Sequence, residues 1–115
     1  MTGCIFCKIA KKETATHLLY EDELVVAFND LHPKAPIHTL IIPKLHIETI
    51  NNIIPQQESL VGHLFTVASI LASTLNIAEN GYRVVMNCNQ HGGQAVYHIH
   101  LHLLGGKQLS WPPGC

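Results

Sequence analysis

The chain has 115 residues, 47% of them hydrophobic, with seven Lys or Arg against eight Asp or Glu and a formal net charge of -1. This length and apolar content indicate a single domain over residues 1–115 whose core needs no disulfide bonds. The balanced charge argues against a nucleic-acid partner, and the lack of an apolar run near the ~20 residues that span a bilayer argues against a membrane protein. The N-terminal residues do not show a signal-peptide pattern, so we expect a cytoplasmic protein.

The first half of the chain predicts a short helix and three strands. The helix covers residues 4–12. The strands are runs of apolar or β-branched residues, and they cover residues 18–20, 24–29 and 39–42. Turn residues and prolines separate or end these strands at residues 21–23, 30–36 and 43–46. Because a short turn joins the first two strands, we expect them to pair as a hairpin.

The second half of the chain predicts one long amphipathic helix and two more strands. From Pro55 to about Asn76, leucines and a valine recur every three or four residues, and a proline is tolerated in the first helical turn. Residues 82–88 and 97–104 predict the last two strands, and residues 89–94 form the loop between them. The whole pattern predicts an α+β fold with a mostly antiparallel sheet.

The last predicted strand carries three alternating histidines, His98, His100 and His102. Successive side chains of a strand point to opposite faces, so the three imidazoles share one side and the apolar residues between them share the other. Glycine pairs flank the run at residues 92–93 and 105–106, and glycine backbone can approach a ligand closely. One face of this strand is therefore expected to carry a functional site, and the other is expected to pack into the hydrophobic core.

Three interpretations of the histidine run stay open on its spacing alone. The first is a polar sheet face. A zinc site built from all three is disfavoured, because positions i to i+4 spread over roughly 13 Å at ~3.3 Å per residue, whereas zinc binds imidazole at ~2.0–2.1 Å. The third makes the central His100 a nucleophile, with His102 donating to a substrate phosphate and His98 ordering the row.

The histidine run belongs to a longer motif, Gly-Gly-Gln-Ala-Val-Tyr-His-Ile-His-Leu-His-Leu-Leu-Gly-Gly at residues 92–106, which Trp-Pro-Pro-Gly follows at 111–114. Further matching segments lie at residues 4–9, 27–30, 41–44 and 81–83. Together these segments resemble the histidine triad (HIT) family, and specifically its Hint branch. The resemblance implies a HIT-like α+β fold, with an antiparallel sheet of about five strands, one long helix, a short N-terminal helix and a two-fold homodimer.

The Hint branch contains purine nucleoside phosphoramidases, and the resemblance implies the same chemistry here. His100 is expected to attack the α-phosphorus of a purine nucleoside 5'-phosphoramidate and form a nucleotidyl-histidine, from which water releases AMP without a cofactor. His102 matches the phosphate-contacting histidine. The expected substrates are AMP–amine conjugates and aminoacyl-adenylates. Two alternatives stay open: a purine-nucleotide-binding module with little catalysis, and a dinucleoside polyphosphate hydrolase like the Fhit branch.

The resemblance also implies nucleotide-binding side chains outside the histidine run. Asp30 matches a carboxylate that accepts from the ribose hydroxyls, although an aspartate here is also ordinary turn chemistry. Leu31 matches an apolar residue that lines the nucleoside pocket. Asn87 matches a polar residue that borders the phosphate, and its other interpretation is a strand-end side chain bonded to its own loop. Trp111 resembles a residue near the active sites of the dimer.

A turn before the histidine run is expected to lie along the phosphate. By the resemblance, it consists of the backbone of Gly93, Gln94 and Ala95, which fits the role of N–H groups near developing charge. Some Hint proteins carry a serine in place of Ala95. Losing one hydrogen bond of about 1 kcal/mol predicts a reaction that is several-fold slower.

The N-terminal Cys4-x-x-Cys7 has the spacing of half a zinc site. Relatives in the wider superfamily complete such a site with an upstream histidine and the first histidine of the triad, which here are His46 and His98. The resemblance thus implies a structural zinc ion, since a closed four-ligand site leaves no open position for a substrate. The alternative is a short helix with two apolar thiols.

Overall fold

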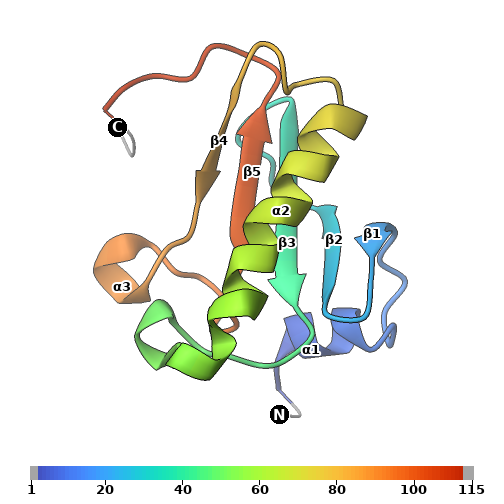
Figure 1. Ribbon diagram of the computed structural model, residues 1–115, viewed down its shortest axis with the longest axis vertical. Coiled ribbons are helices and arrows are strands. Elements are labelled where there is room, and N and C mark those ends of the chain that lie inside the picture. Colours follow the sequence, from blue (N-terminus) through green and yellow to red (C-terminus); the bar gives the residue numbers. More distant parts are fainter. Residues whose placement is uncertain (1–2, 113–115) are drawn as a thin grey trace.

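A five-stranded antiparallel sheet forms the centre of the molecule (Figure 1). The computed structural model describes residues 3–112. The strands are β1 (Leu18–Glu21), β2 (Val25–Asn29), β3 (Ile37–Pro43), β4 (Tyr82–Val85) and β5 (Leu101–Gly105), and their order in the sheet is β1-β2-β3-β5-β4. The helices are α1 (Ile5–Ala10), α2 (Glu58–Thr74) and α3 (Asn89–Gly92), with single 3-10 turns at Ile50–Asn52 and Pro55–Gln57. The predicted α+β class and the five-stranded antiparallel sheet are confirmed.

Different helices pack on the two faces of the sheet. The register pairs Leu40 with His102 and Ile41 with Leu101, so neighbouring pairs point to opposite faces. Helix α2 covers one face, where its Leu64, Val67 and Leu71 form one core with strand residues that include Ile41 and Leu101. The short helix α1 covers part of the other face, which carries His102. Because α1 covers only part of that face, a functional site can lie on the rest of it.

Helix α2 follows the predicted apolar spacing. Its buried residues are Leu64, Val67, Ala68, Leu71 and Ala72, which form a stripe that faces the sheet. The helix was expected to begin at Pro55, but a 3-10 turn covers Pro55–Gln57 and the α-helix begins at Glu58. Within residues 3–112, no helix is both long enough and apolar enough to cross a membrane.

The last two strands are shorter than predicted. Strand β5 begins at Leu101 instead of residue 97, and the one-turn helix α3 occupies most of the predicted loop at 89–94. Strand β4 ends at Val85 instead of residue 88. By the register, Ile99 would lie opposite Pro43, which has no N–H to offer a ladder. The N–H of Ile99 donates instead to the carbonyl of Ile47, at 2.8 Å.

Candidate active site

A pocket of about 340 Å³ opens on the face of the sheet that α1 partly covers. Residues of α1 form one apolar wall, and the end of β2 with the following loop forms another. The lining includes Ile5, Phe6, Ile9, Phe28, Asp30, Leu31, Ala95, His100 and His102. Two of the three predicted histidines thus share a pocket that has an apolar side and a polar side.

The hydrogen bond of His100 determines which ring nitrogen is free. Its Nδ1 lies 2.8 Å from the carbonyl oxygen of His98, and a carbonyl oxygen can only accept. Nδ1 must therefore carry the proton, which leaves a lone pair on Nε2. Burial lowers the pKa of His100, so the ring is neutral at pH 7. A neutral imidazole with a free Nε2 can act as a nucleophile.

His102 has the opposite tautomer, because a histidine behind it determines where its proton lies. The backbone N–H of Lys34 donates to Nδ1 of His38 at 2.9 Å, so neutral His38 carries its proton on Nε2. That Nε2 lies 2.9 Å from Nδ1 of His102, to which it donates, and 3.4 Å from a carboxylate oxygen of Asp30. His102 therefore carries its own proton on Nε2.

The lowered pKa values of His102 and His38 keep both imidazole rings neutral. Burial and the neighbouring His100 and His38 lower the pKa of His102 to about 4. Burial also lowers the pKa of His38, although Asp30 opposes this effect. The ring centroids of His100 and His102 are 4.9 Å apart. The pocket thus offers a free ring nitrogen beside a ring N–H donor.

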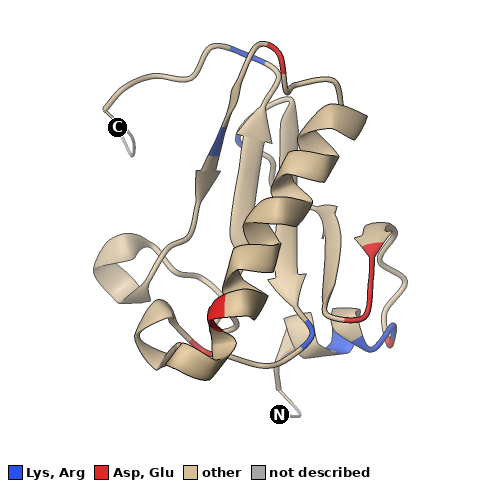
Figure 2. Cartoon of the chain, in the orientation of Figure 1, with Lys and Arg blue, Asp and Glu red and all other residues tan. Residues whose placement is uncertain are grey.

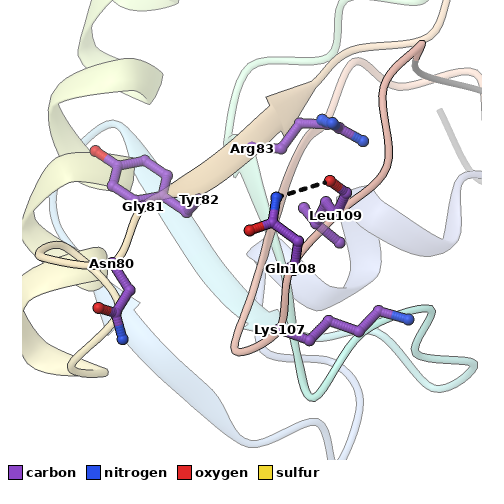
Figure 3. Close-up of a pocket in the computed structure, with 7 residues that line it drawn as sticks. All are labelled: Asn80, Gly81, Tyr82, Arg83, Lys107, Gln108 and Leu109. Carbon is purple, nitrogen blue, oxygen red and sulfur yellow. Dashed lines mark hydrogen bonds between the residues drawn. The ribbon is translucent and has the colours of Figure 1, made fainter.

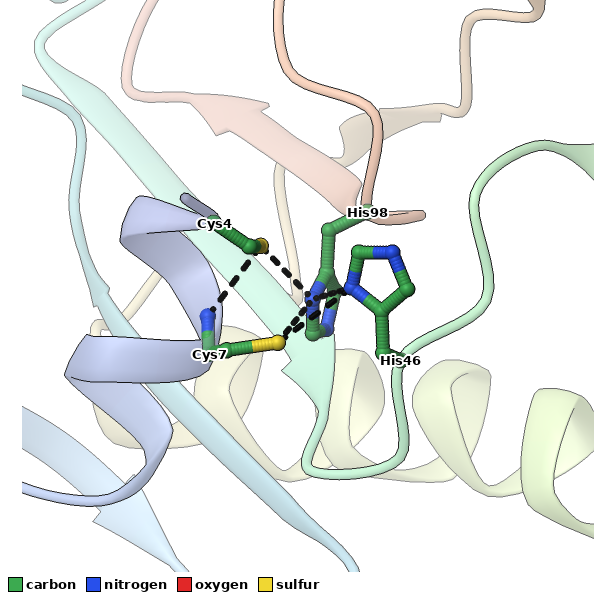
Figure 4. A group of neighbouring side chains, drawn as sticks. All are labelled: Cys4, Cys7, His46 and His98. Atoms are coloured by element: carbon green, nitrogen blue, oxygen red, sulfur yellow. Dashed lines mark hydrogen bonds between the residues drawn. The ribbon is translucent and has the colours of Figure 1, made fainter. Parts of the chain in front are cut away.

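His98 does not stand in an imidazole row behind His100, contrary to the expectation from strand alternation. Its ring is buried and turned toward Cys4, Cys7 and His46 (Figure 4). Residues 97–100 lie outside β5, which allows this separation. His98 orders His100 through its backbone carbonyl and not through its ring.

The side chains of His98 and its three neighbours, Cys4, Cys7 and His46, fit a tetrahedral zinc ion. Four of the donor distances are short: Cys4 Sγ to His98 Nδ1 3.4 Å, Cys7 Sγ to His46 Nδ1 3.2 Å, Cys7 Sγ to His98 Nδ1 3.6 Å, and His46 Nδ1 to His98 Nδ1 3.2 Å, and all donor atoms lie within 4.8 Å of one another. Tetrahedral zinc holds sulfur and nitrogen ligands about 3.6 Å apart and two nitrogens about 3.3 Å apart, so the donor set has the required size.

Among residues 3–112, only one of the two histidines in this group has a hydrogen-bond partner for its second ring nitrogen. Nε2 of His98 donates to the carbonyl oxygen of Pro43 at 2.7 Å, as a metal-ligating histidine usually does with its second nitrogen. This bond also leaves Nδ1 of His98 with a lone pair toward the thiols. Nε2 of His46 is buried and has no hydrogen-bond partner among residues 3–112. Chemistry and distances therefore match the predicted four-ligand set, Cys4, Cys7, His46 and His98.

Asp30 and Leu31 lie in the same pocket as His100 and His102. Both line the pocket, and the side chain of Leu31 is 89% exposed. One carboxylate oxygen of Asp30 accepts from the N–H of His32 at 2.8 Å, which is the local bond of an Asx turn. The other oxygen faces His38. Asp30 therefore combines the turn role and a place in the pocket.

The turn at residues 93–95 offers fewer free N–H groups than expected. The N–H groups of Gly93 and Gln94 donate to the carbonyls of Gln90 and Asn89, at 3.0 and 3.1 Å. The N–H of Ala95 has no partner among the described residues, and Ala95 alone of the three lines the pocket. Gln94 is buried and stabilises the turn through its side chain.

Asn87 also acts on this turn. Its Nδ2 donates to the carbonyl oxygen of Gly92 at 2.6 Å, and its side chain does not line the pocket. This geometry agrees with the interpretation of a strand-end side chain bonded to its own loop. Within the described residues, Asn87 and Gln94 both shape the turn that presents Ala95.

Sequence reasoning missed two parts of the site, His38 and the apolar wall of α1. His38 stands two residues before Leu40 in β3, so it shares the face of His102. The alternation of β3 was a usable signal, but the register between β3 and β5 was not available from sequence. Phe6 packs edge-on against His100, with ring centroids 5.1 Å apart.

Other hollows on residues 3–112 have different linings. A smaller hollow of about 200 Å³, lined by Arg83, Lys107 and Gln108 among others, lies where β4 begins and β5 ends (Figure 3). None of the pocket histidines reaches it. Figure 2 shows the basic residues at separate places on the chain, on α1, on β4 and in several loops. Along residues 3–112 they form no continuous stripe of the kind that tracks a nucleic-acid backbone.

Comparison with known proteins agrees with this geometry. The model of the HIT domain matches residues 11–109. The purine nucleoside phosphoramidase of Escherichia coli (strain K12) is 50% identical over 105 residues, which are 91% of this chain and 88% of that protein. The crystal structure of a HIT family hydrolase from Legionella pneumophila has a TM-score of 0.95 and 50% identity, covering 97% of this chain and 100% of that one. A histidine triad protein from Clostridium difficile has a TM-score of 0.93 and 42% identity, covering 96% of each chain. The chain therefore belongs to the histidine triad (HIT) family, as its motifs predicted.

Proposed function

We propose that this HIT family hydrolase cleaves the P–N bond of purine nucleoside 5'-phosphoramidates and releases AMP. The observation that carries the proposal is the pair of opposite tautomers, a free Nε2 on His100 beside an Nε2–H on His102. Cleavage of a phosphoramidate needs a nucleophile and a hydrogen-bond donor at the phosphate, and this pair supplies both. The name of the Escherichia coli relative supports the same substrate class.

The reaction proceeds in two displacements. In the first, the lone pair on Nε2 of His100 attacks the α-phosphorus, the P–N bond breaks, and the departing nitrogen takes up a proton from solvent and leaves as an amine. In the second, water attacks the nucleotidyl-histidine and returns a proton to solvent, the bond between phosphorus and His100 breaks, and AMP is released. His102 donates its Nε2–H to a phosphate oxygen in both steps. His98 holds the Nδ1–H of His100 through its carbonyl.

The pocket residues divide between the nucleoside and the phosphate. Asp30 accepts from the ribose hydroxyls, and Leu31 with the α1 wall contacts the base. The N–H of Ala95 donates to the phosphate, while Gly93, Gln94 and Asn87 shape the turn that presents it. AMP–amine conjugates fit this division, and aminoacyl-adenylates carry the same nucleotide on a different leaving group.

This function is tested by using chromatography to measure the release of AMP from adenosine 5'-phosphoramidate. Diadenosine polyphosphates serve as the competing substrates. Faster turnover of the phosphoramidate supports the proposal, and faster turnover of the polyphosphates supports the Fhit-like alternative. Binding of AMP without turnover of either substrate supports the binding-module alternative, for which the missing hydroxyl at Ala95 is the relevant observation.

We further propose that Cys4, Cys7, His46 and His98 hold a structural zinc ion, on the strength of the distances and donor chemistry. When bound, zinc supplies a cross-link among α1, the segment after β3 and the segment before β5. It takes no part in the displacement at phosphorus, because His100 lies outside the ligand set. Catalysis itself requires no cofactor.

His38 is expected to act as a positioning residue for His102. Replacing His38 with Phe removes the donor that faces Nδ1 of His102, so the proton of His102 can move to Nδ1 and Nε2 loses its donor role. We expect kcat to fall about 10- to 100-fold, as is typical for partners that orient an imidazole, with little change in KM. His38→Gln keeps an N–H donor and is expected to recover part of the loss. Equal losses in both variants, with a raised KM, would indicate a merely structural role.

A second copy of the chain is expected to cover α2 and the edge strand β4. Residues 59–74 of α2 contain no Lys, Arg, Asp or Glu, and Phe65 and Ile70 on its outer side are 49% and 44% exposed. An uncharged exposed helix face is unusual for a monomer. Light scattering is expected to give twice the chain mass of 12.7 kDa. Ser69→Glu, in the middle of this face, is expected to give the monomer mass, and Ala15→Glu, an exposed control before β1, is not. A monomer mass for the native chain would exclude the dimer.

A further inference from the structure

Helix α1 carries two kinds of side chain that point to different sites. Cys7 lies in the helix and Cys4 caps its N-terminus, and both thiols contact His98. Ile5, Phe6 and Ile9 of the same helix form a wall of the nucleotide pocket. The helix has six residues, so a change at its thiols reaches the wall within two turns.

Two contacts connect the thiols to the nucleophile. The first runs through His98, because its ring faces the thiols while its carbonyl accepts the Nδ1–H of His100 at 2.8 Å. The second runs through Phe6, which packs edge-on against both rings, with centroids 6.0 Å from His98 and 5.1 Å from His100. The thiols of Cys4 and Cys7 therefore stabilise both the wall of the pocket and the ring that reacts.

Of the two cysteines, Cys4 borders the solvent. Cys4 is partly exposed and, with His46, lines an open hollow of about 470 Å³ on the other side of the turn at residues 95–96. Ala95 and Val96 line this hollow and the nucleotide pocket alike. Cys7 is buried, but its Sγ lies in the same group of ligand atoms, all within 4.8 Å of one another (Figure 4). A small oxidant can therefore reach Cys4. The thiol of Cys7 is near enough to attack the oxidised Cys4 and form a disulfide.

We propose that Cys4 and Cys7 are an oxidation site at which peroxide controls nucleotide binding. The two thiols lose two electrons and two protons and form one S–S bond, while the O–O bond of hydrogen peroxide breaks and yields two water molecules. A Cys-x-x-Cys pair at the start of a helix has the spacing of redox-active dithiols. The N–H of Cys7 already donates to Sγ of Cys4 at 3.3 Å, which holds the two residues in one turn.

Oxidation removes the two thiol contacts with His98 and, where zinc is bound, two of its four ligands. Helix α1 then depends on its apolar contacts alone, so the wall formed by Ile5, Phe6 and Ile9 loosens. We expect the affinity for AMP to fall about fivefold and turnover to slow by a similar factor. Reduction by dithiothreitol is expected to restore both. The turnover part of this inference rests on the proposed function, whereas the binding and mass measurements do not depend on turnover.

The experiment uses the variant Cys88→Ser, Cys115→Ser, in which Cys4 and Cys7 are the remaining thiols. Reduced samples, with and without zinc, are treated with hydrogen peroxide. Intact mass is expected to show the loss of two hydrogens, a chelating dye is expected to show release of zinc, and calorimetry is expected to show the weaker binding of AMP. A matched variant that also carries Cys4→Ser and Cys7→Ser is expected to bind AMP equally before and after peroxide.

Two results would overturn the inference. One is a confirmed Cys4–Cys7 disulfide whose AMP affinity equals that of the reduced protein. The other is oxidation to sulfinic acid without a disulfide, which dithiothreitol does not reverse. If the reduced protein binds AMP but does not turn over the phosphoramidate, the proposed function fails while the effect of the disulfide on AMP binding still tests the oxidation site.

Discussion

Replacing His100 with alanine is expected to lower AMP release from adenosine 5'-phosphoramidate by a factor on the order of 1,000 or more, while the protein stays folded. Neither of the other two histidines of the triad is arranged to replace it. His102 has its proton on Nε2 and its lone pair bonded to His38, and the ring of His98 is turned toward Cys4 and Cys7. Mass spectrometry of quenched reactions is expected to show a nucleotidyl adduct on His100 in the native chain and none in the variant.

The controls separate lost chemistry from lost structure. His100→Gln keeps more of the side-chain volume beside Phe6 than alanine does, and it is expected to be equally inactive. His17→Ala removes an exposed imidazole outside the pocket and is expected to keep full activity. Thermal unfolding and AMP binding report on the fold of each variant. Full activity of His100→Ala would refute the mechanism, and a native chain that binds AMP but forms neither adduct nor product would favour a binding module.

Much of the fold was predictable because its signals are local. The spacing of Leu64, Val67 and Leu71 predicted the helix, and the alternation around His100 predicted which side chains enter the core. The ends of β4 and β5 were wrong, because a strand continues only where a partner offers hydrogen bonds. Pro43 offers no N–H opposite Ile99, and no local pattern near residue 97 records the residue that pairs across the sheet.

Only those site residues that lie within one contiguous motif were predictable from the sequence. His100, His102 and the loop with Asp30 were named from contiguous motifs, and all three line one pocket. His38 was missed, since its bond to His102 depends on the register between β3 and β5. For the His98 ring, strand alternation predicted a row with His100, whereas the predicted ligand set grouped it with Cys4, Cys7 and His46, where it lies. Its direction is determined by Cys7 and the carbonyl of Pro43, which lie far from it in sequence.

Zinc is expected to bind at one equivalent per chain and to raise the stability of the protein strongly. A ligand that binds only the folded state stabilises it by about 4 kcal/mol when its free concentration is a thousand times Kd. For a chain of this size, that corresponds to a rise of roughly 10–20 °C in Tm. Cys7→Ser is expected to abolish retention of zinc and this rise, whereas Cys88→Ser, which removes a thiol outside the four-residue group, is expected to change neither.

The pH dependence gives this prediction a definite sign. Burial and the neighbouring Cys4 raise the pKa of the Cys7 thiol, so zinc must displace a proton from Cys7 when it binds. Affinity for zinc, and with it the gain in Tm, is therefore expected to fall as the pH falls, and differential scanning at several pH values measures both. If added zinc leaves Tm unchanged at every pH, the four side chains are a hydrogen-bonded cluster. Helix α1 is then held over the pocket by those hydrogen bonds and by the contacts of Phe6 and Ile9 with the sheet.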